Sequence, residues 1–301
     1  MVISGLKHLI SLLLSASSVF GIYVRDDVAL ASFNSLAGDS RFAAGGYVGL
    51  AGSGTFCSGT LVAPSVVLTA GHCVDSDTNG VVDLPVGGLA FGTEANPLLM
   101  VANVASVVVN PLWVSSLGNA AFDLALLNLS APINTVTPAT LGFALNPTGM
   151  DAVMLGYGYQ GTGTADFNTI GTRRAAENVI DVTGGTLLTD FDSPAGDTSS
   201  FGPATPRFLE GTTAPGDSGG PLFAMVGSDA YLVGVLHGGY NPFGPDSWYG
   251  DVSIYTAINS TANRTFLAAN GLVAVPEPTP WVMVLMGSSL MMMGLRGRWR
   301  Q

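Results

Sequence analysis

Residues Gly216–Pro221 read GDSGGP and place one serine, Ser218, in a short run dominated by glycine. Two further segments stand out upstream of it. Leu68–Cys73 reads LTAGHC and follows a predicted strand, and Asp123–Leu129 reads DLALLNL and begins with an aspartate before a predicted strand. The three segments supply a hydroxyl, an imidazole and a carboxylate, the groups from which a nucleophilic site can be built.

Around these segments, from about residue 42 to residue 258, short apolar runs alternate with turn residues. The runs are rich in Val and Leu and have the length of strands; examples are 65–69 (SVVLT), 104–109 (VASVVV), 124–129 (LALLNL), 152–155 (AVML) and 231–236 (YLVGVL). This pattern predicts an all-β fold, either a sandwich or a barrel. One helix is predicted at about 262–270, where Gly271 would end it, and 183–206 is predicted to be a loop.

The composition agrees with a turn-rich β protein. Of the 301 residues, 10% are charged, 48% are hydrophobic and 40 are glycine, whereas a helical bundle would need many more charged residues on its solvent faces. The net charge of −11 argues against a nucleic-acid partner, because little in the chain could neutralise a row of phosphates.

The N-terminal residues predict a secretory signal peptide over 1–21. Lys7 and His8 form a weakly basic start, and Leu9–Phe20 is an apolar stretch that ends in small residues. Cleavage near Ala16 and cleavage near Gly21 both fit. An uncleaved membrane anchor is the alternative, although the apolar run is short for a spanning helix.

The C-terminal residues 273–301 predict a second targeting segment. Val275–Pro278 (VPEP) is followed by an apolar run, Trp281–Leu295, and then by three arginines at 296, 298 and 300. Such an order predicts a transmembrane helix that stops transfer and leaves a basic tail in the cytoplasm. It resembles the PEP-CTERM sorting signal of Gram-negative bacteria, which implies processing by an exosortase and only transient membrane anchoring; an ordinary tail anchor is the alternative.

These two segments leave residues 22–272 as one exported domain, in the periplasm, at the cell surface or outside the cell. Its two cysteines, Cys57 and Cys73, are 16 positions apart. Two cysteines cannot form a zinc site without help, and His72 is the only candidate helper nearby. In an exported chain a single disulfide is the better interpretation.

A serine nucleophile needs an imidazole to remove its proton and a third group to fix the tautomer of that imidazole. The chain has three histidines, and His8 leaves with the signal peptide, so His72 and His237 remain as candidate bases.

The segments around His72, Asp123 and Ser218 resemble those of the trypsin-like serine proteases. LTAGHC is similar to the family's Thr-Ala-Ala-His-Cys, Phe56–Leu61 (FCSGTL) to Phe-Cys-Gly-Gly-Ser-Leu, DLALLNL to Asp-Ile-Ala-Leu-Leu-Lys-Leu, and GDSGGP matches the nucleophile motif at all six positions. The resemblance implies a chymotrypsin-like double six-stranded antiparallel β-barrel with a short C-terminal helix. It also implies a Ser218–His72–Asp123 triad and a disulfide between Cys57 and Cys73.

The same resemblance assigns roles to the residues around Ser218. The backbone N–H groups of Gly216 and Ser218 would form the oxyanion hole, and glycine at 216 would allow a backbone geometry that a side chain obstructs. Asp217 would be a structural residue that pairs with a new N-terminal amine. The family's Ile-Val-Gly-Gly activation sequence is absent, so cleavage after Arg25 or Arg41, a salt bridge to an arginine, and the amine left by the signal peptidase all remain open.

The resemblance also places a specificity pocket, with Thr212 at its base, where trypsin has a carboxylate. Thr213, His237, Gly238, Gly239 and Ser253 would complete the pocket. A pocket of this kind is small and weakly polar, so small or medium uncharged side chains are expected rather than Arg or Lys. His237 departs from the family, which has serine there; it would either hydrogen-bond Asp123 and tune the triad or form a wall of the cleft.

The segment Asp75–Asp83 (DSDTNGVVD) has the alternating oxygen ligands of a calcium loop, with Asp75, Asp77, Asn79 and Asp83 as candidates. An EF-hand would place a bidentate Glu at the twelfth position, where this chain has Val86. An acidic surface turn is therefore the favoured interpretation, and no cofactor is expected.

Together these features predict a secreted serine endopeptidase that cleaves proteins or peptides through an acyl-enzyme intermediate. One alternative is a surface-displayed, protease-like scaffold that binds without cutting. A serine esterase of the α/β-hydrolase class would need Gly-x-Ser-x-Gly and the order Ser, Asp, His, and this chain has the order His, Asp, Ser.

Overall fold

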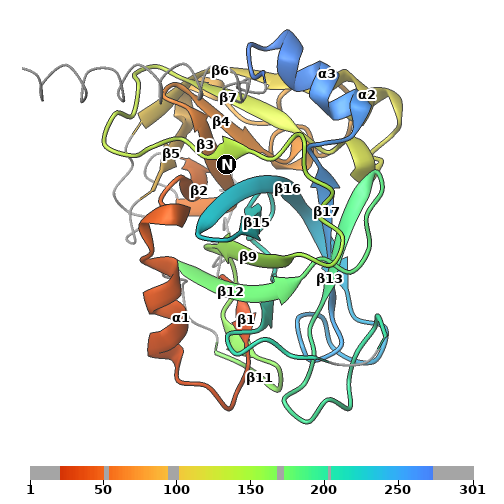
Figure 1. Ribbon diagram of the computed structural model, residues 1–301. Helices are drawn as coiled ribbons and strands as arrows, with labels where there is room; N and C mark the ends of the chain where they lie inside the picture. Colours follow the sequence, from red (N-terminus) through yellow and green to blue (C-terminus); the bar gives the residue numbers. More distant parts are fainter. Residues whose placement is uncertain (1–20, 51–53, 94–101, 168–172, 203–204, 274–301) are drawn as a thin grey trace, which may run out of the picture.

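The computed structural model describes residues 21–50, 54–93, 102–167, 173–202 and 205–273 (Figure 1). Apart from Gly21 and Val273, the predicted signal peptide and the predicted sorting segment with its transmembrane helix lie outside these residues. Within the described ranges, no helix is both long and apolar enough to span a membrane.

The first half of the domain is a closed barrel of six strands, as predicted. Around the barrel the order is β2-β3-β4-β7-β6-β5, and all neighbouring pairs are antiparallel. The strands are β2 (Gly45–Leu50), β3 (Gly54–Ala63), β4 (Val66–Thr69), β5 (Leu89–Gly92), β6 (Ala102–Val109) and β7 (Ala125–Leu129). The apolar runs seen in the sequence fill it: Val67, Leu68 and Leu127 are fully buried in its core.

The second half is a sheet that does not close into the predicted second barrel. Its strands run in the order β12-β9-β15-β16-β17-β13, and a short β8 pairs in parallel with β16. They are β8 (Thr140–Leu141), β9 (Asp151–Gly156), β12 (Arg174–Val179), β13 (Thr186–Asp190), β15 (Pro221–Val226), β16 (Asp229–Tyr240) and β17 (Val252–Ala257).

The opening lies between β12 and β13, where side chains replace a ladder of backbone hydrogen bonds. The Asn178 side chain on β12 donates to the backbone carbonyls of Asp190 and Gly211, and an isolated bridge joins Val182 to Leu188. With β8 this sheet has seven strands rather than the predicted six, and the backbone closure expected of a barrel is absent among the described residues. β13 itself lies inside the predicted 183–206 loop, which was therefore wrong in part: Leu187 is fully buried and pairs with Tyr255 of β17.

A small third sheet anchors the start of the domain to the segment that precedes Ser218. It comprises β1 (Tyr23–Val24), β10 (Gly161–Thr162), β11 (Ala165–Asp166) and β14 (Gly211–Thr212), in the order β11-β10-β1-β14. β1 pairs in parallel with β10 and antiparallel with β14, so the residues after Gly21 are held beside the turn that carries the GDSGGP motif.

Helices are short and lie outside the sheets (Figure 1). They are α1 (Leu30–Ala37), α2 (Pro111–Ser115) and α3 (Thr261–Ala269), with 3-10 turns η1 (Ser40–Phe42), η2 (Gly71–Cys73), η3 (Val86–Gly88) and η4 (Ala120–Phe122). The predicted C-terminal helix is confirmed as α3, whose N-terminus is capped by Ser260 and which precedes Gly271 at φ +82°. α1 was not predicted; it buries Phe33 and Ala37, four residues apart, and packs against β12.

Candidate active site

His72 lies on η2, directly after β4, and Asp123 holds it in place from the end of η4. The backbone N–H of His72 donates to Asp123 Oδ1 at 2.8 Å, and Nδ1 of its ring lies 2.6 Å from Asp123 Oδ2. Gly71 makes this approach possible, because a Cβ there would lie 2.9 Å from Trp113 Cδ1 and 3.0 Å from Asp123 Oδ1.

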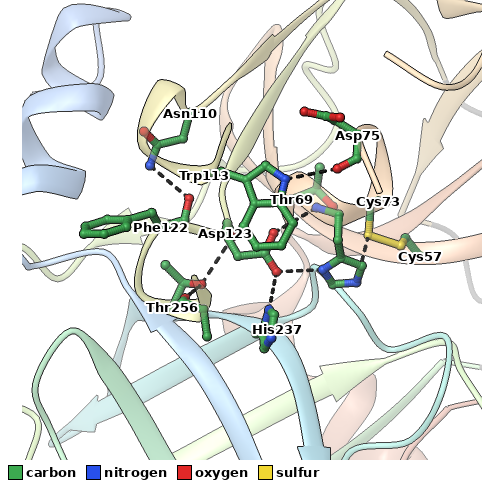
Figure 2. Close-up of polar contacts among 12 residues, drawn as sticks. Cys57, Thr69, Cys73, Asp75, Asn110, Trp113, Phe122, Asp123, His237 and Thr256 are labelled. Carbon is green, nitrogen blue, oxygen red and sulfur yellow. Dashed lines mark hydrogen bonds and ion pairs between the residues drawn. A yellow bond between two sulfur atoms is a disulfide. The ribbon is translucent and has the colours of Figure 1, made fainter. Parts of the chain in front are cut away.

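Asp123 is fully buried and also accepts a hydrogen bond from a second histidine. Nδ1 of His237, from β16, lies 2.5 Å from the same Oδ2 atom (Figure 2). The two imidazole rings meet edge to face with centroids 5.7 Å apart. Burial raises the pKa of Asp123, but the hydrogen bonds from His237 and His72 outweigh burial and lower it to about 2. Asp123 is therefore a carboxylate at neutral pH.

The surroundings of Asp123 fix its orientation. Thr256 Oγ1 on β17 donates to the Asp123 backbone carbonyl, and Asn110 Nδ2 donates to the carbonyl of the preceding Phe122. The Trp113 ring packs beside both histidines, and its Nε1 donates to the Asp75 carbonyl at 3.0 Å. Sequence reasoning missed Trp113 and Asn110, because isolated residues of these types carry no recognisable motif.

Ser218 lies in the turn between β14 and β15. This turn packs against the segment that leads to His72. The Ser58 backbone N–H donates to the Ser218 carbonyl at 2.7 Å, and a Cβ added to Gly219 would overlap Thr69 Oγ1. The described residues show no hydrogen bond between the Ser218 hydroxyl and His72. Catalytic hydrogen bonds are often long before substrate binds.

The backbone around Ser218 has the features expected of an oxyanion hole. Gly216 has φ +93°, in the left-handed region where a side chain is disfavoured. Within the described residues, the N–H groups of Gly216 and Ser218 donate to no protein acceptor, whereas those of Asp217, Gly219 and Gly220 are all paired.

Asp217 is fully buried and binds the start of the domain. Its carboxylate accepts the backbone N–H groups of Ile22 (2.9 Å), Gly158 (2.6 Å) and Ala214 (2.8 Å). Burial raises its pKa to about 6, although the three N–H donors and the charge of Arg174 act in the opposite direction. Arg174 forms no direct ion pair with Asp217 among the described residues; it donates instead to the Ile22 carbonyl and to Gln160.

Cys57 and Cys73 form the predicted disulfide, with their Cα atoms 6.3 Å apart. It ties β3 to η2 next to His72, and Figure 2 shows the bond between the two sulfur atoms. The disulfide and the segment that carries His72 are thus one local unit.

The predicted pocket residues divide into two groups. Thr213, Gly238 and Gly239 line a cavity of about 140 Å³ next to Ser218. Thr212 and Ser253 lie behind its wall, almost fully buried and hydrogen-bonded to each other at 2.9 Å.

His237 is not among the cavity residues, because its ring is turned toward Asp123. The cavity is also lined by two carboxylates, Asp246 and Asp251, neither of which was assigned to it from the sequence. Asp251 lies directly before β17, two residues from Ser253, and that spacing was the signal that could have revealed it.

The candidate calcium residues lie together but bind their own loop. Ligand oxygens of Asp75, Asp77 and Asp83 lie within 4.8 Å of one another. Asp75 accepts the N–H groups of Asn79 and Gly80, and Asp83 accepts both the N–H and the hydroxyl of Ser76. The carboxylates thus already serve as acceptors that fold an acidic turn.

Comparison with known proteins identifies a family that matches this chain. The family described as Trypsin matches residues 37–263. Lectizyme of Glossina austeni is 27% identical over 211 residues, which cover 64% of this chain and 70% of lectizyme. Chymotrypsin-like elastase family member 1 of Canis lupus familiaris is 35% identical over 88 residues, 29% of this chain and 32% of the elastase. Chymotrypsin-like elastase family member 3A of Homo sapiens is 38% identical over 81 residues, 26% of this chain and 30% of that protein.

The chain therefore spans about a third of the length of the two elastases and more than two thirds of lectizyme. The family match covers most of the chain and contains the histidine, aspartate and serine segments described above. This protein belongs to the trypsin family.

Proposed function

We propose that the protein is a serine endopeptidase in which Ser218 is the nucleophile, His72 the general base and Asp123 the orienting acid. The observation that carries the proposal is the buried Asp123 carboxylate, which binds both the backbone and the ring of His72. Membership of the trypsin family and an intact GDSGGP motif support it further.

The geometry around Asp123 favours one tautomer of His72. A carboxylate accepts but does not donate, so Nδ1 carries the proton and Nε2 keeps a free lone pair. Nε2 takes the Ser218 Oγ proton as Oγ attacks the peptide carbonyl carbon. The same imidazolium then protonates the leaving amine, and an acyl-enzyme remains. Water attacks the ester by the same route and releases the second product.

The unpaired N–H groups of Gly216 and Ser218 are proposed to stabilise the oxyanion of the tetrahedral intermediate. Each such donor typically contributes about 3 kcal/mol to transition-state stabilisation. The positive φ of Gly216 supports this role, because it turns the backbone in a way that a residue with a side chain would resist.

We also propose that the active chain begins at Ile22, after cleavage of the Gly21–Ile22 bond. The Ile22 nitrogen already lies 2.9 Å from the buried Asp217 carboxylate, so cleavage would place an ammonium there and supply the missing counter-charge. Ile22 also has φ +49°, which is rare for a β-branched residue and is no longer imposed once the preceding peptide bond is cut. Arg25 and Arg41 instead pair with Asp27 and Asp39.

Removal of residues 1–21 would then serve as both export processing and activation, with no separate zymogen step. The sorting signal predicted at 273–301 supports export by a Gram-negative bacterium and processing by an exosortase-type enzyme. Mass spectrometry of both ends of the protein purified from its host tests this proposal. A chain that starts at Ile22 and lacks the C-terminal arginines is expected, and an active chain starting elsewhere would contradict it.

Labelling with a fluorophosphonate, followed by mapping of the adduct, tests the peptidase itself. The adduct should fall on Ser218 and disappear in Ser218→Ala, while Ser228→Ala, at an exposed turn, keeps it. Asp123→Asn should slow labelling, because the tautomer of His72 is no longer fixed. A folded chain that neither reacts nor cleaves a casein-type substrate would favour the binding scaffold instead.

A further inference from the structure

The cavity beside Ser218 is built around a carboxylate that has no role in the proposed catalysis. Besides Ser218 it is lined by Thr213–Pro215, Leu236, Gly238, Gly239 and the loop residues Asp246, Ser247 and Asp251. Its position next to the nucleophile means that a substrate side chain flanking the scissile bond would enter it.

Asp251 is only 2% exposed, and its two carboxylate oxygens differ in their hydrogen bonding. Oδ2 accepts a hydrogen bond from Thr212 Oγ1 at 2.8 Å. Oδ1 is buried and makes no hydrogen bond within the described part of the chain. The described residues also provide no ion pair to Asp251, and the other charged residue lining the cavity is Asp246, a second carboxylate.

A buried carboxylate that has no counter-charge and leaves one oxygen unpaired is costly, and such groups are normally compensated. Burial raises the pKa of Asp251 to about 6 and the nearby charge of Asp246 adds to the rise, although the Ser247 backbone and the Thr212 hydroxyl act in the opposite direction. The described residues supply no positive charge to Asp251, so the missing partner would be a cation that enters the cavity. The cavity volume of about 140 Å³ suits one side chain of medium to large size.

We propose that this cavity is the primary specificity pocket and takes a lysine or arginine side chain, with Asp251 as the specificity-determining carboxylate. The proposal rests on the peptidase function proposed above and reverses the expectation of an uncharged side chain. That expectation rested on Thr212, which has no charge; in the structure Thr212 donates to Oδ2 of Asp251, which leaves Oδ1 as the oxygen without a partner.

Matched peptide substrates test this proposal. Tetrapeptide substrates with a chromogenic leaving group would carry lysine, norleucine, arginine, citrulline, alanine or valine before the scissile bond. Norleucine and citrulline keep the shape of lysine and arginine and remove the charge. A hydrogen bond to a charged partner is expected to raise kcat/KM for lysine over norleucine about 10- to 100-fold.

Asp251→Asn keeps the shape of the side chain and should abolish most of that ratio. Asp229→Asn, at the exposed start of β16, is the matched control and should keep the ratio. If Asp251→Asn does not fold, the pH dependence of the wild-type ratio replaces it. The ratio should fall as pH drops through about 6, because protonation removes the charge of Asp251. The titratable groups that act on Asp251 or respond to it are Asp246 and Tyr255.

The outcomes separate this proposal from the proposed function. An enzyme that is labelled at Ser218 but prefers alanine or valine, or cleaves lysine and norleucine substrates equally, would overturn the pocket assignment alone. Failure of both labelling and cleavage in a folded wild-type chain would overturn the peptidase function and the pocket with it.

Discussion

Removal of the Cys57–Cys73 disulfide should destabilise the domain by a predictable amount. The two residues are 16 positions apart, and closing a loop of that size is worth about 3 kcal/mol in the chain-entropy model. For a domain of this size, each kcal/mol shifts the melting temperature by about 2–4 °C, so the midpoint should fall by roughly 6–12 °C.

Three variants make the experiment specific: Cys57→Ala, Cys73→Ala and the double variant Cys57→Ala/Cys73→Ala. Either single change already breaks the bridge, so all three variants should lose about the same stability in urea unfolding, and the two single losses should not add. Both cysteines are almost fully buried, so a small packing cost also accompanies each change. Additive losses would mean that packing, rather than loop closure, accounts for the effect, and would refute the reasoning.

The same variants should remain active well below their melting temperatures. The two hydrogen bonds that His72 donates to Asp123 do not involve the disulfide, and β3 and β4 are already joined by backbone pairing. Loss of activity at a temperature where the fold is intact would show that the disulfide also positions His72.

Three further predictions concern the buried charges. Asp123→Asn should lower kcat about 10⁴-fold with little change in KM, measured on the preferred peptide against Asp229→Asn. His237→Ser removes one of the two ring donors to Asp123 and should lower kcat about 10-fold with an altered pH profile; unchanged kcat and profile would exclude a positioning role for His237. Burial raises the pKa of Glu210 from 4.5 to about 8 and the pKa of Asp181 from 3.8 to about 7. At a pH between the unfolded and the folded pKa of either group, the folded state therefore binds more protons than the unfolded chain. The unfolding free energy should therefore fall as pH rises from about 5 to 8, and Glu210→Gln should flatten the slope in calorimetry at several pH values.

Much of the first barrel and of the segments around His72 and Asp123 could be predicted from sequence because the interactions there are local or carried by strong motifs. The runs that became β4 and β7 are continuous, apolar and strand-sized, and they flank His72 and Asp123 directly. Cys73 is adjacent to His72, so the disulfide and the base share one segment. Gly216 was assigned a special backbone geometry, and its φ of +93° confirms it.

The features that escaped prediction depend on contacts between distant segments. β13 lies in a largely polar stretch in which Leu187 is the one fully buried apolar residue of the strand, and it becomes a strand only because β17 pairs with it. The second sheet does not close into a barrel because the Asn178 side chain lies between β12 and β13, and no sequence pattern in β12 predicts this. His237 was open to two interpretations, and only the three-dimensional position of Asp123, 114 residues away, shows that the two side chains form a hydrogen bond.

The three buried aspartates of the site illustrate how the partner of a carboxylate, rather than its burial, indicates its role. Asp123 accepts donors from two histidines, and its pKa falls to about 2, as expected for a permanent negative charge that orients a base. Asp217 accepts three backbone N–H groups, one of them from Ile22 at the predicted start of the active chain, so its missing charge can come from the chain itself. Asp251 has one oxygen bound by Thr212 and one without a partner, at the wall of the cavity that reaches Ser218. Of the three, Asp251 is the one for which the described residues leave an oxygen without a partner, which is why we propose that a substrate cation completes it.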